Sequence, residues 1–111
     1  MTLAKADRKP PAAVADAAGR GLDLREKFGR GGTAVGVKRA KQLSDRKPVT
    51  DADILAISSY FKRHRVDKDA KTHEWGNEDD PSAGYVAWLL WGGDVGERWA
   101  DGLKVEVEGR K

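Results

Sequence analysis

Apolar residues recur at helical spacing in five stretches of this chain, separated by polar or glycine-rich segments. The strongest stretch runs from Tyr85 to Trp91, where nearly every side chain is apolar, and a helix that is apolar on all sides lies buried at the centre of a domain. Three of the four tryptophans fall within residues 80–99. The pattern predicts an all-α fold: a compact single domain of about five short helices around a central Trp-rich helix.

The first helix is predicted over residues 12–28. Its two internal glycines, Gly19 and Gly21, weaken a helix but allow another element to approach closely. The glycines of residues 29–32 then predict its end, since glycine adopts the left-handed conformation common after a helix. The apolar face consists of Val14, Ala18, Leu22 and Phe28.

Capping residues predict where the later helices begin. Thr33 and Thr50 are suited to cap the second and third helices, because their hydroxyl oxygens accept a hydrogen bond from a free backbone N–H. Asp80, followed by a proline, is predicted to cap the fourth helix. Asp94 and Glu97 have the spacing of a capping box and predict the start of the fifth.

Outside the helices, three segments are predicted to be irregular. Residues 1–11 are polar and end in two prolines, which predicts a flexible arm before a helical domain over residues 12–103. Residues 66–79 lack periodicity and are predicted to form a loop that Trp75 pins to the core. Residues 104–111 alternate like a strand without a partner, so we expect a tail that orders only by docking.

Charge is unevenly distributed, although the whole chain carries a net charge of only +3. Residues 20–65 contain 12 Lys/Arg against 5 Asp/Glu, a balance of +7, and residues 66–111 contain 6 against 11, a balance of −5. This asymmetry favours a nucleic-acid face or charge complementarity between copies, so an oligomer is possible. Two ordinary solvated surfaces would produce the same pattern.

The basic segment supplies the candidate functional residues. The helices on either side of residues 44–48 lack the tight glycine turn typical of a helix-turn-helix, so sequence-independent contact with phosphate is favoured over base reading. The candidates for nucleic-acid or anion binding are Arg25, Arg30, Lys38, Arg39, Lys41, Arg46, Lys47, Arg63 and Arg65. The tryptophans are expected in the core, with a surface pair for base stacking or partner docking as the alternative.

Other chemistry has little support in the sequence. The glycine-rich residues 29–36 lack the lysine of a Walker loop and follow a helix, which leaves a phosphate-holding helix N-terminus or simple helix termination. His64 and His73 lack metal-ligand spacing and there is no cysteine, so neither a metal nor a cofactor is expected. Ser82 lacks the context of a nucleophile elbow, and the carboxylates of residues 78–80 fit a helix start. We expect no enzymatic activity.

Several segments together resemble a small module recurrent in tailed-bacteriophage genomes, which occurs as a free-standing protein and near or fused to head-morphogenesis proteins. The resemblance runs from Ala18 to Ala100. It is carried by RGGTAVGVKRA at 30–40, YFKRHRVDK at 60–68, PSAG at 81–84, Trp88, LWGGD at 90–94, and Trp99 with Ala100. It implies phage origin and a non-enzymatic role, and it assigns no functional residues.

These observations lead to one functional expectation and two alternatives. We expect a phage-encoded binding module whose basic face, residues 20–65, contacts nucleic acid or an acidic phage or host protein during head assembly or packaging. The alternatives are a structural component of the virion, in the capsid or head–tail region, and an inhibitor of a host protein. No apolar stretch approaches the ~20 residues of a membrane span, and no secretion signal is visible. The expected location is the host cytoplasm or the virion, without membrane contact or secretion.

Overall fold

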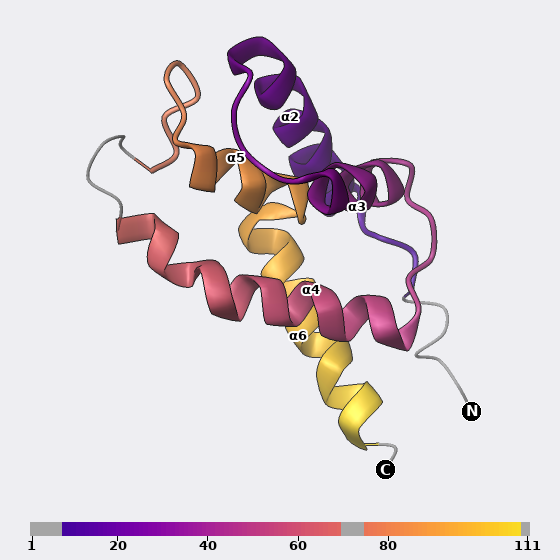
Figure 1. The fold of residues 1–111 in the computed structure, drawn as a ribbon. Coiled ribbons are helices and arrows are strands. Elements are labelled where there is room, and N and C mark those ends of the chain that lie inside the picture. The colour runs from indigo at the N-terminus through magenta and orange to yellow at the C-terminus, as the bar shows by residue number, and fades with distance from the viewer. Residues whose placement is uncertain (1–7, 70–74, 110–111) are drawn as a thin grey trace.

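The computed structural model describes residues 8–69 and 75–109, and within these ranges it contains helices and no strand (Figure 1). The elements are α2 (Ala12–Phe28), α3 (Ala34–Ser44), α4 (Asp51–His64), the short 3₁₀ helix η1 (Arg65–Asp69), α5 (Ala83–Leu90) and α6 (Gly93–Gly109). The predicted all-α fold is confirmed. In the part of the chain so described, no helix combines the length and apolar character needed to cross a bilayer.

Side-chain caps begin three of these helices. The Thr33 hydroxyl accepts a hydrogen bond from the Gly36 N–H (3.2 Å) at the start of α3. Thr50 and Asp53 form a reciprocal capping box at the start of α4, where Asp51 and Asp53 also place negative charge in the first turn. Both threonine caps were predicted from the sequence and are confirmed.

The predicted starts of the last two helices are wrong. α5 is capped by Ser82, whose hydroxyl accepts from the Tyr85 N–H (3.0 Å), while Asp80 accepts a hydrogen bond from Arg30 (3.1 Å). Asp94 lies inside α6, which begins at Gly93, and its carboxylate accepts from the Trp88 indole N–H (2.8 Å) instead of capping the helix. In each case a side chain from outside the helix engages the carboxylate.

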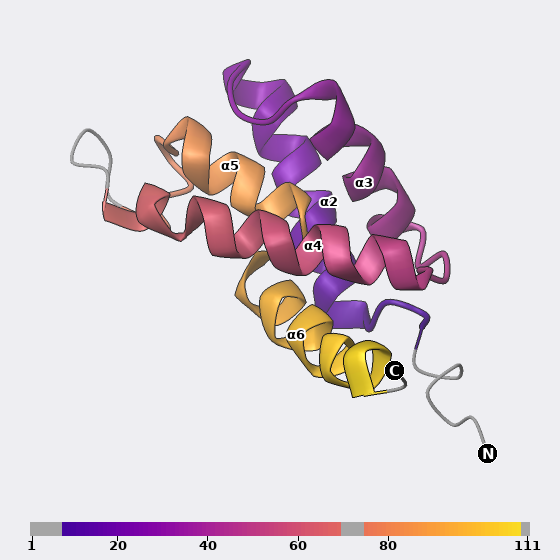
Figure 2. The same ribbon diagram turned by 60° about the horizontal axis from the view of Figure 1, so that its bottom comes forward.

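The helices pack in two groups that share α5. α2 lies against α3 and α5, and α4 crosses α6, as the two views show (Figures 1 and 2). α5 contacts members of both groups, and five of its eight residues are buried. The prediction of a central, buried Trp-rich helix is therefore confirmed.

Aromatic rings fill the space between α4 and α5. Trp88 is 1% exposed and Phe61 is fully buried, with their ring centroids 4.6 Å apart in an edge-to-face arrangement. Trp91 stacks on Tyr60 at 4.6 Å, with only 6° between the planes. Trp75 meets Trp88 edge-on at 5.6 Å, so the predicted return of Trp75 to the core is confirmed.

Only one of the two glycines in α2 permits a close approach between helices. A Cβ at Gly21 would lie 2.8 Å from the backbone nitrogen of Leu90, whereas a Cβ at Gly19 would meet nothing within 4 Å. The absence of a side chain at Gly21 thus lets the backbones of α2 and α5 pack directly against each other.

The described ends of the chain are more ordered than the sequence predicts. Within the expected arm, Arg8 is 8% exposed and forms an ion pair with Asp51 (2.7 Å), and Pro10 is buried. The carbonyl of Arg8 accepts from the Val49 N–H (3.0 Å), which ties this segment to the α3–α4 loop. Residues 1–7 lie outside the described part, so the expectation for them is not addressed.

Residues 104–109 are helical, where the sequence predicted a tail. They continue α6, and Val107 is only 8% exposed because it packs with the core cluster. The apolar positions Leu103 and Val107 are four residues apart, so they lie on one face of a helix. Residues 110–111 lie outside the described chain. In the predicted loop over residues 66–79, residues 70–74 also lie outside it, and the residues before them belong to the short 3₁₀ helix η1.

The two glycines of α2 should respond in opposite directions to alanine. Gly19→Ala should raise the free energy of unfolding by about 0.5–1 kcal/mol, because alanine favours the helix and meets open space. Gly21→Ala should lower it by about 1–3 kcal/mol, because the new methyl would push α5 away. Urea unfolding measures both, and equal stability of the two variants would contradict the proposed close packing.

Trp91→Ala should remove a stacked core ring. We expect a loss of about 3–5 kcal/mol in the free energy of unfolding, since Trp91 is 9% exposed and packed on Tyr60. Trp91→Phe should recover part of the loss by restoring a ring in the same place. Near-wild-type stability of Trp91→Ala in chemical denaturation would show that this ring contributes little to the core.

Candidate anion-binding surface

The candidate surface is centred on α3, whose two sides differ in character. Gly36, Ala40 and Leu43 are buried against the rest of the fold. Lys38 and Lys41 are exposed on the opposite side. The periodicity of the helix thus places its lysines in solvent, where the sequence predicted them.

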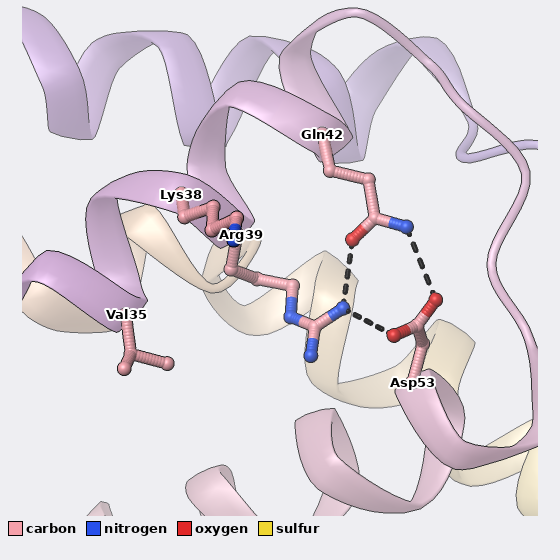
Figure 3. Close-up of a pocket in the computed structure, with 5 residues that line it drawn as sticks. All are labelled: Val35, Lys38, Arg39, Gln42 and Asp53. Carbon is pink, nitrogen blue, oxygen red and sulfur yellow. Dashed lines mark hydrogen bonds and ion pairs between the residues drawn. The ribbon is translucent and has the colours of Figure 1, made fainter.

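A cleft of about 350 Å³ lies between α3 and the first turn of α4. The residues that line it are Val35, Lys38, Arg39, Gln42 and Asp53 (Figure 3). Val35 is 62% exposed and adds an apolar edge. The cleft therefore combines an apolar rim at Val35, the exposed cation of Lys38 and a set of hydrogen-bonded polar side chains.

The polar base of the cleft is a closed set of hydrogen bonds. One terminal amino group of Arg39 donates to the Gln42 carbonyl oxygen (2.7 Å) and to Asp53 (2.8 Å), and the Gln42 amide donates to the other Asp53 oxygen (3.1 Å), as Figure 3 shows. Burial alone would raise the pKa of Asp53. Hydrogen bonds from the Thr50 N–H, Arg39 and Gln42 outweigh it and lower this pKa to about 2. Asp53 is therefore ionised at neutral pH and neutralises Arg39.

The Arg39 guanidinium also packs over an aromatic ring. Its guanidinium carbon lies 5.3 Å from the centroid of Trp91, within the range of a cation–π contact. Trp91 stacks on Tyr60, and Tyr60 stacks on His64 at 4.4 Å. A column of planar side chains thus connects α3 to the end of α4, and Arg39 is part of the fold as well as of the surface.

Four other predicted candidates are engaged within the chain. Arg25 donates to the Gly31 carbonyl (2.9 Å), and Arg30 to the Pro81 carbonyl (2.9 Å) as well as to Asp80. Arg46 donates to the Pro10 carbonyl (2.8 Å), and Arg65 pairs with Glu97. These arginines hold loops and helix ends in place.

The charge asymmetry of the sequence is partly neutralised inside the fold. Arg20 pairs with Glu78 (3.4 Å), Arg30 with Asp80 and Arg65 with Glu97, so three ion pairs connect the basic segment to the acidic one. Charge complementarity between copies of the chain was one explanation of the uneven charge distribution. These ion pairs show that opposite charges within a single chain account for part of it.

The remaining candidates are exposed but do not gather at one place. Lys38, Lys41, Lys47 and Arg63 form no ion pair within residues 8–69 and 75–109. The lysines belong to α3 and the loop after it. Arg63, like the paired Arg65, lies at the opposite end of α4, away from that loop (Figures 1 and 2).

The residues considered for other chemistry have structural partners. His64 Nδ1 lies 3.2 Å from Asp67, and the described chain contains no group of three or more candidate metal ligands; His73 and Glu74 lie outside it. Ser82 serves as a helix cap, and Glu78 accepts a hydrogen bond from the Tyr85 hydroxyl (2.8 Å).

Two cations that sequence reasoning missed line a second cleft. Lys9 and Arg98 lie there together with Arg46 and Trp99. Both fall outside the basic segment, Lys9 in the expected arm and Arg98 in the acidic half of the chain. No local signal in the sequence shows that the fold brings them together.

No protein-family model matches this chain, and no match is found among curated proteins or solved structures.

The low pKa of Asp53 predicts an acid-sensitive contribution to stability. A carboxylate with a folded-state pKa of about 2 and an ordinary value of 3.8 stabilises the fold above pH 3.8, and this stabilisation is lost as the pH falls towards 2. Asp53→Asn should therefore lower the free energy of unfolding at neutral pH by about 1–2 kcal/mol. The deficit should shrink as the pH falls from 3.8 to 2.

Chemical denaturation at several pH values measures this dependence. Asp45→Asn is the matched control, because Asp45 is an exposed carboxylate in the loop between α3 and α4. A deficit for Asp53→Asn that stays constant between pH 3.8 and 2 would contradict the proposed role of the ionised carboxylate.

Proposed function

We propose that this chain is a non-enzymatic, phage-encoded binding module that contacts the phosphate backbone of nucleic acid, or an acidic protein surface, during head assembly or packaging. The observation that carries the proposal is the presence of Lys38, Lys41 and Lys47 on α3 and its following loop, exposed and without ion pairs in the described chain. The phage setting rests on the sequence resemblance alone.

Unpaired lysines matter more for this function than the count of basic residues. A paired arginine contributes little net charge at a distance, because its carboxylate partner cancels it. Each lysine that neutralises a phosphate releases a counterion from the nucleic acid. Three such contacts give a slope of roughly −3 for log affinity against log salt concentration. The expected binding is therefore weak and strongly salt-dependent.

The geometry of α3 favours contact without sequence reading. Arg and Gln are the side chains that commonly form paired hydrogen bonds with base edges. Arg39 and Gln42 are the residues of these types on α3, and both are bonded to Asp53. Lys38 and Lys41 carry point charges that suit a phosphate but select no base.

The proposal predicts a localised effect of charge reversal on DNA binding. The double variant Lys38→Glu/Lys41→Glu should weaken binding to short double-stranded DNA of arbitrary sequence by more than about 10-fold at low salt, and should reduce the salt slope by about two. Fluorescence anisotropy across a salt series measures both quantities.

The matched control is Lys62→Glu/Arg63→Glu, which changes the net charge equally at the far end of α4. It should bind nearly as well as the unmodified chain. Equal weakening by both double variants would mean that binding follows net charge and not the α3 surface. No binding at low salt would exclude the nucleic-acid form of the proposal and favour an acidic partner protein, a structural role in the virion or inhibition of a host protein.

A further inference from the structure

The second cleft, beside α6, has a composition different from that of the α3 surface. It measures about 540 Å³, within the range of ligand sites, and three segments far apart in the sequence contribute to it. These are the stretch before α2, the α3–α4 loop and the middle of α6 (Figure 2). The lining residues are Lys9, Pro11, Arg46, Arg98, Trp99, Gly102, Leu103 and Glu106.

We propose that this cleft binds single-stranded nucleic acid, with one base stacked against Trp99 and the adjacent phosphate held by Lys9, Arg46 and Arg98. The inference goes beyond the proposed function, because it assigns a different surface and a different form of nucleic acid. It does not depend on the lysines of α3.

Trp99 differs from Trp88 and Trp91 in its surroundings. Trp88 and Trp91 are buried and packed on other rings. Trp99 is only partly buried: it packs against the core cluster and also borders the cleft. Near it, a Cβ at Gly102 would meet nothing within 4 Å, so the space in front of this part of α6 is open. An indole with a supported and an open side suits a stacked base.

The cations around Trp99 outnumber the carboxylates by three to one. Lys9, Arg46 and Arg98 are exposed, and Glu106 is the one acidic residue in the lining. The Arg46 side chain donates one hydrogen bond within the described residues, through its Nε, so its two terminal amino groups are available to a ligand. The cleft therefore attracts an anion beside an aromatic surface.

The backbone at Arg46 fixes the direction of this side chain. Its φ of 56° makes it the one non-glycine residue of the described chain in the left-handed region. The N–H groups of Arg46 and Lys47 donate to the Leu43 and Gln42 carbonyls (3.0 and 3.1 Å), so this conformation closes the C-terminal end of α3. The turn directs the guanidinium towards Pro10 and the cleft.

The combination of groups favours a single strand over the other anionic partners. In a duplex the faces of the bases are already stacked on one another, so Trp99 has nothing to pair with. An acidic peptide would satisfy the cations but leave the indole unused. A single strand offers both a free base face and a phosphate next to it.

The test compares two oligonucleotides of equal length and charge: oligothymidylate, and an abasic strand with the same phosphates but no bases. The unmodified protein should bind oligothymidylate more tightly. Trp99→Leu, which keeps an apolar side chain against the core, should weaken oligothymidylate binding by about 5- to 100-fold and leave abasic binding unchanged. Arg98→Ala should weaken both.

Gly102→Leu provides a variant that preserves the fold. Leucine favours a helix over glycine and its Cβ meets open space, but its side chain would fill the cleft beside Trp99. It should remove the preference for oligothymidylate even if Trp99→Leu proves unstable. Lys38→Glu/Lys41→Glu should retain that preference, which separates this inference from the proposed function of α3.

Three results would overturn the inference. The first is equal affinity of the unmodified protein for the two strands, which would reduce the cleft to a general anion contact. The second is a preference for oligothymidylate that survives in Gly102→Leu. The third is binding of free thymidine monophosphate as tight as that of the strand, which would indicate a nucleotide pocket instead.

Discussion

The burial of Trp88 is the constraint on which the other parts of the fold depend. A buried indole needs a partner for its N–H, and Asp94 supplies the acceptor at 2.8 Å. That carboxylate also accepts from Lys68 (3.0 Å), whose ammonium lies 4.6 Å from the Trp88 ring. One side chain of α5 thereby fixes the first turn of α6 and the position of η1. In a chain with few large apolar residues, the Trp88 ring fills much of the core, and the polar contacts around it fix how the neighbouring elements are arranged.

Local chemistry explains why much of the fold was predictable. The starts of α3 and α4 follow from Thr33 and Thr50, whose hydroxyls bond backbone groups only three residues away. The start of α5 could not be predicted in this way, because Asp80 and Ser82 are both suitable N-cap residues. The choice depends on Arg30, which binds Asp80 and the Pro81 carbonyl from a distant part of the chain. Sequence periodicity contains no information about such a contact.

The same limit applies to the C-terminal end and to the candidate sites. The alternation after Leu103 fits a strand, but Leu103 and Val107 also fit one face of a helix, and packing on the core decides between them. The basic residues can be counted in a sequence, but the carboxylates that they pair with in the fold cannot be identified from it. Arg39 and Arg65 therefore looked like surface contacts and form ion pairs. The cleft beside Trp99 exists only because three separate segments meet.

The contact between Gly21 and Leu90 has a consequence for how the chain folds during its synthesis. α2 is made before α5 and α6, yet these later helices cover its buried face. Until those segments leave the ribosome, α2 packs mainly against α3, and that pair buries too little to be stable alone. Folding of this domain is therefore completed only after α5 and α6 have been synthesised. Its late step is the closure of a long loop between α2 and α5.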